Sequence, residues 1–155
     1  MAGCEAALTG LWFEGQQHFA GTLSSDYTER DIPVFEETKC WLDLYFSGRA
    51  PDFTPPLLPR STAFRRQVWD ILLTVPYGRT ITYGEIADRI ARQTGVIRMS
   101  ARAVGNAVGH NPVSLIIPCH RVIGTDGRLT GYAGGIDKKE WLLQMEQKSA
   151  AKGCP

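Results

Sequence analysis

A proline-rich run between Ala50 and Pro59 interrupts this chain of 155 residues, with four prolines in the ten residues A-P-D-F-T-P-P-L-L-P. Proline fixes its own φ and lacks a backbone N–H, so the run excludes a regular helix and favours an extended, stiff connection. The charge reverses at the same place, because residues 1–59 carry a net charge of −6 and residues 60–155 carry +7. We therefore predict two domains, 1–59 and 60–155.

The composition indicates a folded globular protein, because 43% of the residues are apolar and 21% are charged. The basic second half, with ten arginines, suggests a polyanionic partner. The four cysteines, Cys4, Cys40, Cys119 and Cys154, form no C-x-x-C pair, so we expect neither a zinc site nor a redox motif. Since no membrane-spanning run or signal peptide is apparent, we expect a cytoplasmic protein with reduced thiols.

The first half is expected to hold a small sheet and one amphipathic helix. Residues Leu8–Glu14 have the composition of a strand. Asp31 is a plausible N-cap for a helix that Gly48 ends. The apolar face of this helix has helical spacing and comprises Val34, Thr38, Trp41, Leu42, Tyr45 and Phe46.

The second half begins with three predicted helices. Ser61 caps the first, which runs to Leu73, and a capping box of Thr82 and Glu85 opens the second, which ends at Gly95. The third starts near Ser100 and runs to about His110, with Arg102 pointing outward. The last two resemble a helix-turn-helix, although the pattern alone fits an ordinary helical hairpin equally well.

A buried strand is predicted next, because the apolar run V-S-L-I-I over residues 113–117 is short and continuous. Cys119, His120 and Arg121 follow it, after Pro118. Five glycines between Gly124 and Gly135 indicate a loop, and Asp137 with Glu140 forms an N-terminal box for a last helix that carries Glu146.

These neighbours make Cys119 a candidate nucleophile. A thiol needs a lowered pKa or a nearby base to react, and both His120 and Arg121 adjoin Cys119. Glu146 could orient His120, which would give a carboxylate, imidazole and thiol relay with a water between His120 and Cys119. The alternative is that Cys119 is only a small buried residue, which holds for most cysteines in proteins.

The run N-P-V-S-L-I-I-P-C-H-R-V-I-G, from Asn111 to Gly124, resembles the active-site signature of the O6-alkylguanine-DNA alkyltransferases. R-A-V-G-N-A-V before it, and G-Y-A-G-G and K-E-W-L-L-Q-M-E after it, extend the resemblance over about residues 62–148. The resemblance implies an α+β protein. It would consist of a small N-terminal sheet-and-helix domain, shortened at its start, and a helical C-terminal domain with a winged-helix-like helix-turn-helix for DNA.

The resemblance also implies the roles of the catalytic residues. Cys119 matches the nucleophile that takes the alkyl group in one in-line displacement, His120 the water-linked base, and Glu146 the carboxylate that holds it. Asn111 matches the residue that organises the active-site turn. Tyr83 matches the tyrosine that helps to rotate the nucleotide and donates a hydrogen bond to guanine, although a buried core tyrosine is the competing interpretation.

Arg102 matches the arginine finger, which fills the gap that the flipped nucleotide leaves in the stack. The resemblance implies that the helix enters the minor groove, where small residues allow close approach. The expected DNA-binding set is Arg102, Ala103, Gly105, Ala107 and Arg121. For the guanine pocket, the expected residues are Val122 through its carbonyl, Ala133 through its amide, and Tyr132 and Gly134 as the loop that shapes it.

We therefore expect a single-turnover methyltransferase that repairs O6-alkylguanine in duplex DNA and acts as a monomer, without cofactor, metal or membrane. One alternative is a lesion sensor that binds the damaged base without transfer, but such proteins replace the nucleophile that Cys119 provides. A Cys/His hydrolase is a third possibility, and it leaves Arg102 and the basic half unexplained.

Overall fold

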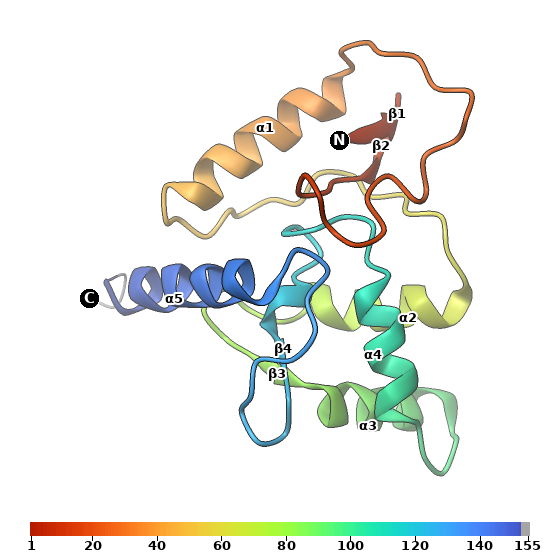
Figure 1. The fold of residues 1–155 in the computed structure, drawn as a ribbon, viewed down its shortest axis with the longest axis vertical. Helices are drawn as coiled ribbons and strands as arrows, with labels where there is room; N and C mark the ends of the chain where they lie inside the picture. The colour runs from red at the N-terminus through yellow and green to blue at the C-terminus, as the bar shows by residue number, and fades with distance from the viewer. Residues whose placement is uncertain (153–155) are drawn as a thin grey trace.

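The computed structural model describes residues 1–152, so Cys154 lies outside the described part. The elements in chain order are β1 (Ala2–Cys4), β2 (Ala7–Gly10), α1 (Pro33–Phe46), α2 (Ala63–Leu73), β3 (Ile81–Thr82), α3 (Tyr83–Thr94), α4 (Ala101–Gly109), a 3-10 helix (Cys119–Arg121), β4 (Val122–Ile123) and α5 (Ile136–Lys152). Figure 1 shows β1, β2 and α1 at one end of the molecule, α2 to α4 at the other, and α5 between them. The predicted α+β class is confirmed.

Two short sheets accompany the helices. β1 and β2 pair antiparallel as a hairpin, and β3 and β4 pair parallel, with Ile81 opposite Val122. A single buried apolar cluster runs through the whole molecule and includes residues from both sides of the proline-rich segment, such as Leu8, Trp41, Val68 and Leu142. No helix in the described residues is long and apolar enough to cross a membrane.

The predicted helix-turn-helix is present as α3 and α4. Thr82 caps α3 through a hydrogen bond from the Glu85 amide, and the Glu85 side chain accepts from the Thr82 amide in return. Gly95 ends α3 with φ of 72°, a left-handed conformation that glycine adopts at little cost. The Ser100 hydroxyl accepts from the Ala103 amide at the start of α4, as the sequence predicted.

Three helix starts differ from the prediction. α1 begins at Pro33, whose missing N–H needs no partner, so Ile32 rather than Asp31 is the N-cap residue. For α2 the cap is Thr62, one residue after the predicted Ser61. α5 begins at Ile136, which places Asp137 inside the first turn instead of at the cap.

Two strand predictions are wrong in extent or in kind. β2 ends at Gly10, where its pairing with β1 stops and Leu11 pairs instead with Val113 in an isolated parallel bridge; the predicted strand ran on to Glu14. Residues 113–117 are buried but form no continuous strand: Val113 pairs with Leu11 in an isolated parallel bridge, and the chain then turns, with Leu115 at φ of 70°. A continuous apolar run indicates that the segment is buried on all sides. A buried turn has the same composition as a buried strand, so the run does not distinguish the two.

Candidate active site

Asn111 holds the turn that leads to Cys119. Its Oδ1 accepts a hydrogen bond from the Val113 amide at 2.9 Å, and its Nδ2 donates to the Ile117 carbonyl at 2.8 Å. The same Nδ2 lies 3.1 Å from the Cys119 Sγ. One buried amide therefore fixes both the backbone of the turn and the position of the thiol.

The Cys119 thiol lies at the start of the 3-10 helix and is 4% exposed. Burial raises its pKa, because a thiolate is costly to form away from water, while the hydrogen bond from Asn111 and the charge of Lys139 act in the opposite direction. The net effect is a raised pKa, so the free protein holds a thiol. Of the two ways to activate the thiol, a lowered pKa is not present in the free protein, so a base must take the proton during the reaction.

Glu146 on α5 collects five hydrogen bonds. Its Oε1 accepts from His120 Nε2 at 2.7 Å, from the Tyr45 hydroxyl at 2.7 Å and from Arg121 Nη2 at 2.9 Å. Its Oε2 accepts from Arg121 Nε at 2.9 Å and from the Gly78 amide at 3.0 Å. Burial alone would raise the pKa of Glu146, but the bonds from His120 and Arg121 and their charges lower it to about 2. The carboxylate is anionic.

His120 has its two ring nitrogens in different surroundings. Because the ionised Glu146 can only accept, Nε2 carries the proton of the 2.7 Å bond. Nδ1 is buried and has no hydrogen-bond partner among residues 1–152, so its lone pair is available for a proton. Burial lowers the pKa of His120, although Glu146 partly opposes this, and the ring is neutral near pH 7. This is the resting state of a base backed by a buried anion.

The outer face of α4 carries Arg102, which is exposed, with Ala103 and Gly105 half-buried beside it. The Tyr83 ring lies over Gly105, where an added Cβ would sit 3.7 Å from the ring edge. The Tyr83 hydroxyl is 3.5 Å from the Thr130 carbonyl, in the loop that follows β4. Tyr83 thus lies between the helix and that loop.

Ala107 is not on this face, contrary to the prediction. It is 1% exposed and belongs to the apolar core, and its carbonyl accepts a hydrogen bond from Trp69 Nε1 at 2.9 Å. The run R-A-V-G-N-A-V contains small residues on two sides of the helix, and Ala107 is small because it packs against α2.

Arg121 also differs from the prediction, because its side chain is buried. Besides its two bonds to Glu146, it donates from Nη1 to the Val75 carbonyl at 2.7 Å, and the residue is 8% exposed. All three nitrogens point into the protein. Arg121 therefore supports Glu146 and lies in the interior, not on an exposed surface with Arg102, contrary to its place in the predicted DNA-binding set.

The loop between β4 and α5 approaches the site from the other side. The Tyr132 ring meets His120 nearly edge-on, with centroids 6.4 Å apart, and its buried hydroxyl has no partner within the described part of the chain. At Gly134 an added Cβ would lie 2.8 Å from the Tyr132 ring, so any larger residue would require that ring to move. The Ala133 carbonyl accepts from the Gln17 amide, which ties this loop to the N-terminal segment.

Sequence reasoning missed Lys139. Its side chain is fully buried, and its Nζ donates to the Val122 carbonyl at 2.5 Å and to the Thr130 carbonyl at 2.7 Å. Burial lowers its pKa to about 8. The helical phase contained the signal, because Lys139 falls on the same face of α5 as Leu142 and Glu146. The carbonyl of Val122, predicted to read guanine, is thus already held by one donor.

Tyr45 was also missed, because it looked like an ordinary member of the apolar face of α1. Its partners Glu146 and His120 are 101 and 75 residues away in the chain, so no local pattern could indicate them.

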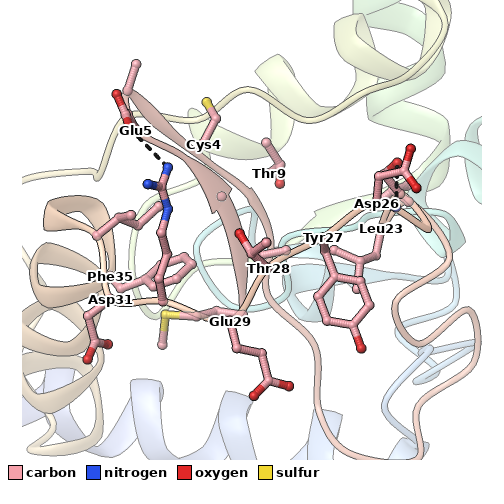
Figure 2. Close-up of a pocket in the computed structure, with 18 of the residues that line it drawn as sticks. Cys4, Glu5, Thr9, Leu23, Asp26, Tyr27, Thr28, Glu29, Asp31 and Phe35 are labelled. Carbon is pink, nitrogen blue, oxygen red and sulfur yellow. Dashed lines mark hydrogen bonds and ion pairs between the residues drawn. The ribbon is translucent and has the colours of Figure 1, made fainter.

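The N-terminal part of the chain contains a large hollow, away from Cys119. Figure 2 shows it between the β1–β2 hairpin and residues 22–32, with a volume of about 1120 Å³. The Arg30 guanidinium and the Glu5 carboxylate, 3.1 Å apart, form an ion pair on its wall. Cys119 and His120 are not among the lining residues, so the hollow is separate from the candidate active site.

Comparison with known proteins agrees with this geometry. Residues 63–148 match the family model of the 6-O-methylguanine DNA methyltransferase, DNA binding domain. The methylated-DNA--protein-cysteine methyltransferase of Mycobacterium bovis is 51% identical over 150 residues, which cover 97% of this chain and 86% of that protein. Its counterpart from Methanosarcina mazei is 42% identical over 149 residues, which cover 96% and 90%.

A solved structure is similar over the same span. The crystal structure of Mycobacterium tuberculosis OGT in complex with DNA superposes with a TM-score of 0.80 at 43% identity, and covers 96% of this chain and 85% of that one. Sequence identity, the matched family model and the shared fold lead to one conclusion. The chain belongs to the family of methylated-DNA--protein-cysteine methyltransferases, which are DNA repair proteins.

Proposed function

We propose that this protein removes the alkyl group, methyl above all, from O6-alkylguanine in duplex DNA and keeps it on Cys119, which inactivates the protein after one reaction. One arrangement supports the proposal above the others. A buried thiol, held by Asn111 at 3.1 Å, is followed in the chain by an imidazole whose Nε2 is fixed by an anionic carboxylate at 2.7 Å.

The chemistry follows from the resting state of these groups. The Cys119 sulfur attacks the alkyl carbon in line with the bond to O6, so a C–S bond forms as the C–O bond breaks. His120 accepts the thiol proton at Nδ1, directly or through a water, and Glu146 stabilises the imidazolium. The proton passes to the released guanine. The product is a thioether, whose C–S bond water does not cleave, so the thiol is not regenerated and the protein acts once.

DNA would meet the α4 face. We propose that Arg102 fills the stack after the nucleotide flips out, that Ala103 and Gly105 allow the backbone to come close, and that Tyr83 assists the rotation. The flipped base would occupy the space beside Cys119. There the predicted pocket residues are the Val122 carbonyl and the loop residues Tyr132, Ala133 and Gly134.

This transfer needs no cofactor or metal, because every bond that forms or breaks belongs to the alkylated guanine, to Cys119 or to the proton that moves between them. We propose a monomer that works in the cytoplasm, since a reducing compartment keeps the Cys119 thiol available for attack.

The first test is intact-protein and peptide mass analysis after incubation with a duplex that contains O6-methylguanine. We expect the peptide bearing Cys119 to gain one methyl group in place of a hydrogen, once per molecule. Cys119→Ser should gain nothing, while Cys40→Ser, which removes an exposed thiol, should react like the wild type. An unchanged mass with tight lesion binding would instead support a sensor without transfer, and repeated turnover of an ester would indicate a hydrolase.

The second test separates base flipping from chemistry. Arg102→Ala should slow transfer from duplex DNA far more than transfer from the free base O6-methylguanine, because only the duplex requires flipping. Arg66→Ala removes an equal charge from the exposed side of α2 and is the matched control. An equal loss on duplex and free base would argue against the proposed role of Arg102.

A further inference from the structure

We propose that Tyr45 is a positioning residue for alkyl transfer: from helix α1 its hydroxyl donates to the Glu146 carboxylate and so limits how strongly that carboxylate holds a proton on the His120 ring. This inference rests on the proposed function. It assigns the N-terminal part of the chain a direct contribution to the reaction, in addition to packing.

The Tyr45 hydroxyl reaches both members of the pair. It donates to Glu146 Oε1 at 2.7 Å and lies 3.2 Å from His120 Nε2, and Tyr45 is fully buried. Oε1 is the same oxygen that accepts from His120. Tyr45 and His120 therefore donate to one atom, and each limits how strongly that atom can bind the other.

Aromatic neighbours fix the Tyr45 ring. It stacks on Trp41 with centroids 5.1 Å apart and an interplanar angle of 10°, and it meets Phe46 and Tyr77 edge-on at 5.4 and 5.8 Å. Such packing leaves the ring few alternative rotamers. The hydroxyl is therefore presented to Oε1 without further loss of side-chain freedom during the reaction.

The hydroxyl stays protonated. Burial raises the pKa of Tyr45 far above its usual value, and the charge of Glu146 raises it further. A permanent donor to Oε1 spreads the negative charge of the carboxylate and so restrains its attraction for the imidazolium. Without the Tyr45 hydrogen bond, Glu146 would stabilise protonated His120 more strongly. The pKa of His120 would then be higher, and the ring would stay protonated up to a higher pH.

Other ionisable groups also face His120. Arg121 and Lys139 lower its pKa by their charge, and Cys119 and Tyr132 lie beside it. Tyr77 faces Tyr45, with the Arg121 guanidinium 5.7 Å from its ring centroid. Replacement of the Tyr45 hydroxyl alone leaves all of these in place, so the change in His120 can be assigned to one atom.

The test is the pH dependence of single-turnover transfer from methylated duplex DNA. Tyr45→Phe should move the midpoint of the acidic limb upward by about one pH unit, with a plateau rate at high pH within about threefold of the wild type. Tyr77→Phe is the matched control, because it removes a neighbouring phenol hydroxyl that makes no hydrogen bond to Glu146 among the described residues, and its midpoint should not move. A uniform loss of rate with an unmoved midpoint would mean that Tyr45 only supports the fold, which would overturn the proposal.

A second variant covers the case in which Tyr45→Phe does not fold. Site-specific replacement of Tyr45 by a fluorinated tyrosine keeps the ring and makes the hydroxyl a stronger donor, so the midpoint should move downward. No movement, or an upward one, would contradict the role.

A failure of the proposed function can be distinguished from a failure of the proposed role of Tyr45. If the wild type transfers no methyl group, NMR titration of the His120 ring in Cys119→Ser, with and without Tyr45→Phe, still decides the inference. A higher His120 pKa in the double variant supports it, and equal values reject it.

Discussion

Replacement of Arg121 by methionine decides between the two roles assigned to this residue. A DNA-contacting arginine would be exposed and would contribute little to stability. In the structure its guanidinium gives two hydrogen bonds to Glu146, at 2.9 Å each, and one to the Val75 carbonyl at 2.7 Å. Methionine has a similar length and fills the same space without donors, so Arg121→Met isolates the loss of those bonds.

The expected loss in the free energy of unfolding follows from the buried groups that lose Arg121 as a partner. Glu146 keeps the bonds from His120, Tyr45 and Gly78 but loses two of five, and the Val75 carbonyl loses its partner. Removal of one member of a buried ion pair costs about 3–5 kcal/mol, and an orphaned carbonyl adds about 1–3 kcal/mol, part of which the apolar methionine offsets. We therefore expect the free energy of unfolding to fall by about 3–5 kcal/mol near pH 7.

The stability that Arg121→Met loses should also depend on pH. The pKa of Glu146 is lowered from 4.5 to about 2, so its stabilising contribution is complete above pH 4.5 and disappears as the pH falls toward 2. Without Arg121 the folded-state pKa returns toward 4.5. The difference between wild type and variant should therefore shrink between pH 5 and pH 2.

Urea unfolding at several pH values measures both quantities, and Arg102→Met is the control, since an exposed arginine should change the free energy of unfolding by no more than about 0.5 kcal/mol. If Arg121→Met unfolds like the wild type and instead reduces the salt dependence of DNA binding, as loss of a phosphate contact would, the buried role is refuted.

Three further outcomes are expected. Asn111→Ala should lower the free energy of unfolding by about 2–4 kcal/mol in urea titrations and slow transfer to Cys119, because buried backbone groups lose their partner; a loss below about 1 kcal/mol would contradict this. Lys139 has a folded-state pKa of about 8 against an ordinary 10.5, so its buried charge penalises folding below pH 8, and this penalty is relieved between pH 8 and 10.5. The test uses a Cys119→Ser background, in which the neighbouring thiol does not titrate. The stability of that protein relative to its Lys139→Met variant should rise over that range, and a constant difference would argue against the buried charge. Thr82→Ala should cost about 1 kcal/mol in thermal unfolding through the lost cap of α3, and an unchanged melting temperature would contradict it.

Local signals in the sequence were reliable where the structure uses local contacts. The capping box of Thr82 and Glu85 and the glycine stop at Gly95 involve atoms at most a few residues apart, so the sequence contains the whole interaction. The failure at residues 113–117 has the opposite cause. Val113 pairs with Leu11 in one bridge, and the Asn111 side chain, outside the apolar run, bonds the Val113 amide and the Ile117 carbonyl and so closes the chain into a turn after it.

Residues whose partners are distant in the chain were not predictable in this way. Tyr45 looks like any other apolar position of α1, and the helical phase of Lys139 indicates burial but not its partners; only the packing of α1 and α5 around the Cys119–Arg121 segment brings both residues to the site. Arg121 was misplaced for the same reason, since its hydrogen-bond partners Glu146 and Val75 are 25 and 46 residues away in the chain.

The proline-rich segment that divides the chain by charge is also bonded to β2. The Leu8 amide donates to the Pro56 carbonyl at 2.8 Å, and the Leu58 amide donates to the Leu8 carbonyl at 2.9 Å. A single protease cut near Phe53 would therefore break the covalent chain but leave these bonds, the shared apolar cluster and the Tyr45–Glu146 contact intact. The two fragments should co-elute as a nicked, noncovalent complex, and separately produced fragments should restore each other by complementation.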